Sequence, residues 1–198
     1  VIGAAWEKPE IALRVALTYN SAITHDFSAN ESTSATPTAF TTEVPQSVNL
    51  EFQSGIAPDT LLFGSIRWAE WSQFDVTPVG YIPIGGSLVD FQNDTITYNI
   101  GLGRRFNETW SGAVTASYEK ANGGFAANLG PTDGATSLGV AATYTRGKIE
   151  ITGGARYIWI GDAVTQAPGS LPLPPGTTFG DFDDNNGVAL GLKIAYNF

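Results

Sequence analysis

The feature that most constrains the fold is an alternation of apolar and polar residues that recurs along the whole chain. It is clearest in the last segment, where every second position is apolar: Val188, Leu190, Leu192, Ile194, Tyr196 and Phe198. Successive side chains of a β-strand point to opposite faces, so this period of two predicts strands with one apolar face. The pattern also predicts a short first strand over 2–7 and seven further full strands: 14–20, 48–53, 62–68, 95–103, 110–119, 137–145 and 149–159. No helical period is evident, and the predicted fold class is all-β.

The faces opposite the apolar stripes consist mainly of Gly, Ala, Ser and Thr, and they also carry charges. Those charged residues are Arg14, Glu51, Arg67, Glu119, Glu150, Arg156 and Lys193. A soluble sandwich buries apolar side chains between two sheets, whereas a transmembrane barrel turns apolar faces to lipid and polar faces to its lumen. Charged residues make up only 15% of the chain, below the roughly one quarter of soluble domains. These features predict an antiparallel, up-and-down transmembrane β-barrel.

The connections between the predicted strands alternate strictly in length. The short ones are 7–10, 55–60, 105–109 and 146–148, and the long ones are 21–46, 75–94, 120–135 and 161–186. Outer-membrane barrels have short periplasmic turns and long extracellular loops, so we expect the C-terminus at the periplasmic end. The long connections hold one basic residue, Lys120, and most of the acidic ones: Asp26, Glu31, Glu43, Asp75, Asp90, Asp94, Asp133, Asp162, Asp181, Asp183 and Asp184.

Composition excludes several classes of function. The chain has 10 Lys and Arg against 19 Asp and Glu, a net charge of −9, which is not typical of nucleic-acid binding. It has no Cys and one His, so we expect no disulfide, no metal site and no cofactor. His25 adjoins Asp26 without a G-x-S-x-G elbow, and we therefore expect no enzyme activity. The chain begins at Val1 and contains no Met, which predicts that it is part of a longer protein.

Aromatic residues gather at the ends of the predicted strands, as expected for the two interfaces of a membrane. The last strand ends in Tyr196 and Phe198, with apolar residues at every second position before them. This ending resembles the C-terminal signal that passes outer-membrane barrels to their assembly machinery. We therefore expect that machinery, outer-membrane lipid and lipopolysaccharide to be partners of this chain.

Four segments, in order, resemble the FadL/TodX family of outer-membrane transporters of long-chain fatty acids and other hydrophobic compounds. The first is the strand Arg14-Val-Ala-Leu-Thr-Tyr-Asn-Ser21, followed by Asp26-Phe27. The others are Val44-Pro-Gln46, Trp68-Ala-Glu-Trp-Ser-Gln-Phe74 and the terminal Ala195-Tyr196-Asn197-Phe198. The resemblance covers nearly the whole chain but only the C-terminal part of the family.

The resemblance implies a barrel of fourteen strands with an N-terminal hatch inside its lumen. Residues 1–198 would be one segment of that barrel, comprising eight full strands and the N-terminal strand stub, without the hatch and about the first five strands. In the family, an extracellular apolar groove captures the ligand, a lumen site receives it, and movement of the hatch releases it sideways into the bilayer. The chain would then be an outer-membrane channel for passive uptake of hydrophobic compounds such as long-chain fatty acids.

Several apolar or basic residues near the long connections are candidates for binding a hydrophobic ligand, lipid or detergent molecule. They are Phe63, Arg67, Trp71, Phe74, Arg156, Ile158 and Ile160. By alternation, Phe63, Trp71, Ile158 and Ile160 would face the lumen, where a mostly apolar pocket with few polar groups suits a fatty acid. The two arginines could pair with a carboxylate head. Alternatively, they form ion pairs with Glu51, Glu119 or Glu150 inside the barrel, which is the interpretation we favour.

Two other architectures are compatible with parts of this pattern. A self-contained eight-stranded barrel could close by itself and serve a structural, adhesive or narrow-pore role, but the strand stub would then have no partner. A soluble lipocalin-like binder would turn its apolar faces inward and its charged faces outward. Pairing between the first and last strands would distinguish a small closed barrel from a segment of a larger one.

Overall fold

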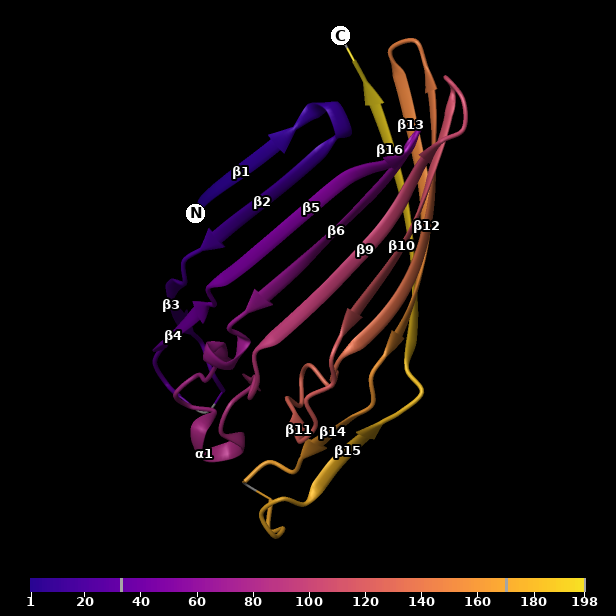
Figure 1. The fold of residues 1–198 in the computed structure, drawn as a ribbon. Helices are drawn as coiled ribbons and strands as arrows, with labels where there is room; N and C mark the ends of the chain where they lie inside the picture. The colour runs from indigo at the N-terminus through magenta and orange to yellow at the C-terminus, as the bar shows by residue number, and fades with distance from the viewer. Residues whose placement is uncertain (33, 170, 198) are drawn as a thin grey trace.

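Nine antiparallel strands form one curved sheet in this computed structural model, which describes residues 1–32, 34–169 and 171–197 (Figure 1). The strands are neighbours in the order in which they occur along the chain. They are β1 (Ile2–Lys8), β2 (Leu13–Asn20), β5 (Ser47–Ala57), β6 (Thr60–Ala69), β9 (Thr95–Arg105), β10 (Trp110–Glu119), β12 (Ala135–Arg146), β13 (Ile149–Ile160) and β16 (Asn186–Tyr196). All nine strands expected from the alternation are present, and the all-β prediction is confirmed.

The short turns and the long connections lie at opposite ends of this sheet, and the C-terminus lies at the short-turn end (Figure 1). The long connections contain further small elements: β3 (Ile23–Ala29), β4 (Thr38–Val44), β7 (Asp75–Val76), α1 (Ile82–Gly85), β8 (Val89–Asp90), β11 (Phe125–Ala126), β14 (Ala163–Gln166) and β15 (Thr178–Phe182). They form three small sheets, β3–β4, β7–β8 and β11–β14–β15. Sequence alone had indicated only loops here.

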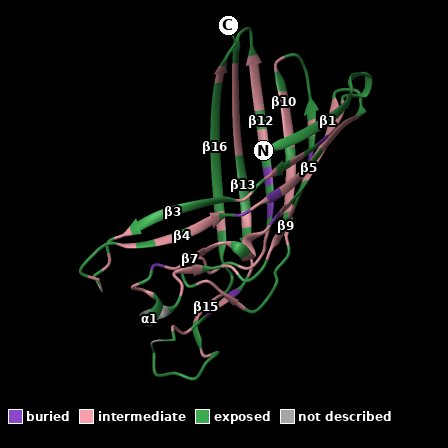
Figure 2. Cartoon of the chain, turned by 90° about the vertical axis from the view of Figure 1, so that its left-hand side faces the viewer, coloured by how far each residue is buried: buried purple, intermediate pink, exposed green. Residues whose placement is uncertain are grey.

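The apolar stripes lie on an exposed face, and the described residues contain almost no apolar core. Prolines apart, the buried apolar side chains of the described residues are Ala16, Ala69 and Ala163. On β12, an interior strand of the sheet, Leu138 and Val140 are 54% and 60% exposed, and Figure 2 shows exposed residues along most of β16. In water, an apolar face of this extent would be an aggregation liability. Within the described part of the chain, no second layer covers this face, which excludes the soluble sandwich.

The sheet is open over the described residues, because β1 and β16 form its two edges and do not pair with each other. This arrangement differs from the closed eight-stranded barrel that was the alternative architecture. The short first strand is a regular member of the sheet, since Ile2–Lys8 pairs along its whole length with β2. Among the described residues, no helix has the length and apolar character needed to cross a membrane.

Register aligns several of the aromatic residues in rows across the apolar face. Tyr98 stands directly opposite Tyr118, and near the short-turn end the rings of Trp110 and Tyr144 lie 5.1 Å apart. The Tyr196 ring is exposed, with the Lys148 ammonium 6.0 Å from its centroid. Phe198, the last residue of the expected assembly signal, lies outside the described residues.

Candidate functional site

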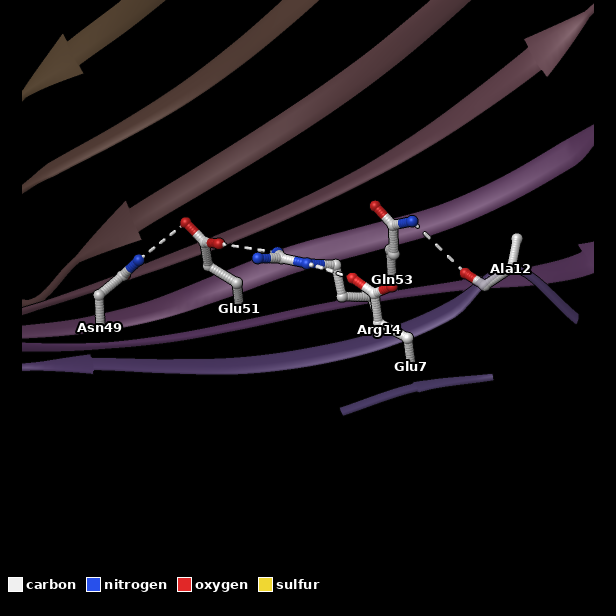
Figure 3. A network of polar contacts seen from close by, with 6 residues as sticks. All are labelled: Glu7, Ala12, Arg14, Asn49, Glu51 and Gln53. Atoms are coloured by element: carbon white, nitrogen blue, oxygen red, sulfur yellow. Dashed lines mark hydrogen bonds and ion pairs between the residues drawn. The ribbon is translucent and has the colours of Figure 1, made fainter. Parts of the chain in front are cut away.

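The polar face carries a network of charged and amide side chains centred on Arg14 (Figure 3). Its guanidinium pairs with Glu7 of β1 at 3.2 Å and with Glu51 of β5 at 3.3 Å. Asn49 donates to the other Glu51 oxygen at 3.0 Å. The Arg14 side chain is 40% exposed, so each pair stabilises the fold by at most about 1 kcal/mol. The network links three neighbouring strands and leaves Arg14 without a free charge for a ligand.

Next to this network lies a recess of about 400 Å³ on the same face. Its lining comes from β2, β5, β6, β9, β10 and β13: Arg14, Glu51, Phe52, Gln53, Phe63, Gly64, Ser65, Asn99, Ile100, Thr115 and Arg156. Phe63 pairs with Gly101 across β6 and β9, and the far atoms of its ring lie over that glycine. A Cβ on Gly101 would overlap the ring atoms Cζ and Cε2 and lie 3.1 Å from Cε1. Because Gly101 has no side chain, the Phe63 ring can lie against the backbone of the sheet at this position.

Arg156 enters the recess from β13 and forms no ion pair with any described residue. Its Nε passes over Gly139 of the neighbouring strand. The expected pairing with Glu51, Glu119 or Glu150 is therefore wrong for Arg156. Glu51 is paired with Arg14, and Glu150 is six residues away along β13, roughly 20 Å at the strand rise.

Arg67 also lacks an ion pair among the described residues, which contradicts the same expectation. Register places Arg67, Thr97 and Glu119 in one row across β6, β9 and β10. Arg67 and Glu119 are thus separated by two strand spacings, roughly 10 Å. The carboxylate of Glu119 instead accepts a hydrogen bond of 2.6 Å from the Thr97 hydroxyl.

At the long-connection end, three aromatic rings form a cluster. Trp71 packs edge-to-face against Phe74 and Phe91, with centroids 5.6 Å apart in both pairs, and Phe74 and Phe91 are 5.7 Å apart. Trp71 does not lie on a strand as the alternation had suggested, because β6 ends at Ala69 and Trp71–Gln73 form a 3-10 helix. Asp94 holds this helix, accepting from the Ser72 hydroxyl at 2.6 Å.

A second cavity, of about 210 Å³, adjoins this aromatic cluster. Trp71, Phe91 and Phe125 line it together with carboxylates and loop glycines. Trp71 and Phe91 lie in the connection between β6 and β9, and Phe125 lies in the connection between β10 and β12, so two long connections meet here. This cavity lies at the end of the sheet where the family resemblance implies ligand entry.

The structure distributes the predicted ligand residues over three places and leaves two of them outside all three. Phe63 and Arg156 line the recess, whereas Trp71 and Phe74 belong to the aromatic cluster. Ile158 lines a further hollow of about 520 Å³, which also includes Arg156. Arg67 and Ile160 do not line the recess, the cavity beside the aromatic cluster or the hollow at Ile158.

Several lining residues of the recess were not among the sequence candidates. Ser65, Asn99 and Thr115 occupy polar-face positions that alternation could identify, but only the pairing register brings them into one recess. Phe91 lies in a connection without alternation, so no sequence pattern marked it as a partner of Trp71. Gly101 carried no signal at all, because its role depends on the neighbouring ring.

Nine antiparallel strands in chain order, short turns at one end and an exposed apolar face constitute the wall of an up-and-down β-barrel.

Comparison with solved structures identifies the barrel type. A FadL homologue from Pseudomonas aeruginosa matches with a TM-score of 0.74 at 13% identity, over 99% of this chain and 51% of that one. The CymD monoaromatic hydrocarbon channel matches with a TM-score of 0.49 at 16% identity, over 75% of this chain and 43% of that one. The sequence matches no family model and no curated protein. The chain thus has a FadL-type fold and spans about half the length of the homologue.

Proposed function

We propose that this chain forms part of an outer-membrane channel for passive uptake of hydrophobic compounds, long-chain fatty acids among them, without covalent chemistry. One observation carries the proposal: a continuous exposed apolar face lies opposite a polar face with a recess that contains an aromatic ring and an unpaired arginine. A lipid bilayer is the environment in which such an outer face is stable. The likeness to a FadL homologue supports the barrel architecture.

In this proposal the short turns and the C-terminus are periplasmic. The alternation of turn lengths supports that orientation. The aromatic rows near both ends of the strands support a sheet that spans the membrane. The acidic long connections would then face the extracellular side, and the apolar face would contact outer-membrane lipid. The C-terminal strand with Tyr196 and Phe198 would serve as the signal read by the barrel assembly machinery.

The route of the ligand would begin at the aromatic cluster of Trp71, Phe74 and Phe91 and continue to the recess. The cluster offers ring faces and edges to an apolar chain. In the recess, Phe63 would contact the chain, and the unpaired Arg156 could form charge-assisted hydrogen bonds with a carboxylate head. No proton transfer is required on this route, and the driving force is the concentration gradient of the ligand.

Uptake into proteoliposomes that contain the purified protein tests this function with two matched ligands, oleate and the uncharged oleyl alcohol. We expect both to enter faster than into protein-free vesicles. Arg156→Gln should slow the uptake of oleate and leave that of oleyl alcohol unchanged. Lys193→Gln is the control, because Lys193 lies on the polar face of β16 and does not line the recess. Equal rates with and without protein would refute the channel, and equal slowing of both ligands would refute the role of Arg156.

A further inference from the structure

The β3–β4 hairpin continues the pairing of β2 and β5 without any change of register. In the sheet, Tyr19 pairs with Val48 and Asn20 with Ser47. In the hairpin, Ile23 pairs with Val44, which is the partner that the same register predicts three pairs further on. No residue is inserted on either side. The two hairpins are thus one long ribbon, interrupted only at 21–22 and 45–46.

The interruption has a local cause, and hydrogen bonds flank it. Pro45 has no backbone N–H, so it cannot donate to the ladder at this point. Gln46 accepts a hydrogen bond from the Tyr19 hydroxyl at 2.8 Å and donates to Glu70 at 2.7 Å. The Glu70 backbone N–H also donates to the carbonyl of Gln46 at 3.1 Å. These bonds fix the direction in which the hairpin leaves the sheet.

Because register is conserved, the apolar face of β2 and β5 continues onto the hairpin. The residues of the hairpin on that face are Ile23, His25, Phe27, Phe40, Thr42 and Val44, and those on the other face include Thr24, Asp26, Ser28, Thr41 and Glu43. The first set contains every large apolar side chain of the hairpin. The second set is polar and contains both of its acidic residues.

This apolar hairpin face is exposed. Ile23, Phe27 and Val44 are 54%, 49% and 46% exposed, and the Phe27 and Phe40 rings stack across the strands with centroids 5.5 Å apart. The hairpin is held to the neighbouring connection where the Thr42 hydroxyl donates to the Asp75 carbonyl at 2.6 Å. A two-stranded hairpin alone is at best marginally stable in water, so an apolar surface against this face would contribute to its stability.

Figure 2 shows the direction of the hairpin: β3 and β4 run sideways, away from the nine-stranded sheet and across the direction of β13 and β16. Strands β13 and β16 are among those that would cross the bilayer under the proposed function. A hairpin that runs across these strands would lie along the surface of that bilayer instead of standing out from it.

We propose that the β3–β4 hairpin rests on the outer leaflet, with the face of Ile23, Phe27, Phe40 and Val44 in contact with lipid acyl chains. The inference rests on the proposed membrane function. Three observations carry it: unbroken register with the lipid-facing strands, exposed apolar residues confined to that face, and the sideways course of the hairpin. The acidic residues Asp26 and Glu43 on the opposite face point away from the anionic headgroups.

The protein has no cysteine, so one introduced thiol can be labelled selectively. We suggest nitroxide labels at Phe27→Cys and, separately, Ile23→Cys in the protein reconstituted in bilayers, read by power saturation with oxygen and with a water-soluble nickel chelate. Oxygen concentrates in lipid and the chelate in water. Ser28→Cys is the matched control on the polar face, and Leu138→Cys on β12 reports a strand of the proposed membrane wall.

The expected result is an oxygen-to-nickel accessibility ratio at 23 and 27 that matches the ratio at 138 and exceeds that at 28 several-fold. High nickel access at 23 and 27 with low access at 138 would overturn the hairpin inference and leave the channel intact. Low access to both reagents at 23 and 27 would mean that protein covers this face, which also overturns it. High nickel access at 138 would refute the membrane wall itself, and the hairpin inference with it.

Discussion

Replacing Gly101 by alanine should close part of the recess, because the added methyl group occupies the space that Phe63 uses. The new Cβ would overlap Cζ and Cε2 of the ring. Both residues sit on neighbouring central strands, in a paired position, so the backbone has little freedom to yield. We therefore expect the ring to rotate off the wall and into the recess.

The magnitude follows from the cost of overpacking, which is typically about 1–3 kcal/mol for an added methylene. If the Phe63 ring moves into the recess, a ligand must displace it. Most of this free-energy cost then appears as weaker ligand binding. A penalty of about 1–2 kcal/mol weakens ligand binding roughly 5- to 30-fold. The free energy of unfolding should fall by less, about 1 kcal/mol, because a half-buried ring beside an open recess can relocate at little cost.

Equilibrium binding of a fluorescent fatty acid to the detergent-solubilised protein, together with urea unfolding, measures both quantities. Gly191→Ala is the control, since a Cβ on Gly191 of β16 would meet no atom within 4 Å. Phe63→Leu should restore binding in the Gly101→Ala background, because the smaller side chain tolerates the methyl group. The reasoning is refuted if Gly101→Ala binds as tightly as Gly191→Ala, or if Phe63→Leu gives no rescue.

Three further substitutions test other parts of the site. Ile158→Glu should weaken binding of long-chain ligands in the same assay, because it places a charge in an apolar part of the polar-face hollow; unchanged affinity would remove Ile158 from the ligand path. Trp71→Ala removes two edge-to-face contacts, worth about 0.5–1.5 kcal/mol each, and should lower the association rate in stopped-flow binding more than it raises the dissociation rate. Arg14→Gln leaves Glu7 and Glu51 without their cation and should lower the free energy of unfolding in urea by up to about 2 kcal/mol, at most about 1 kcal/mol for each pair; a more stable variant would contradict that account of the network.

Alternation predicted the sheet because each strand has one apolar and one polar face, and this property is local to the sequence. The predicted strand 110–119 coincides with β10. The strand predicted over 48–53 continues to Ala57 in the structure. The alternation does not predict this extension, because the register shifts between Gly55 and Ala57 and the alternation is lost there. The β3–β4 hairpin was missed for a different reason: its strands become recognisable through pairing with each other, which single segments do not reveal.

The candidate site was predicted only in part, since it depends on register as well as on faces. Alternation placed Phe63 and Arg156 on the polar face, and the structure brings both to one recess. Alternation could not predict which residues lie opposite one another on neighbouring strands, and the ion pairs expected for Arg67 and Arg156 were therefore wrong. Glu51 pairs instead with Arg14, because β2 and β5 are direct neighbours. This ion pair was not predicted.

The central claim is that one face of every strand meets lipid and the other faces an aqueous lumen. Single cysteines at successive positions 136–142 of β12, labelled with a membrane-impermeant maleimide in intact outer membranes, test it most directly. We predict labelling that alternates with period two: low at the apolar-face positions Thr136, Leu138, Val140 and Ala142 and high at the polar-face positions Ser137, Gly139 and Ala141. Uniform labelling, or an alternation with the opposite phase, would contradict the account.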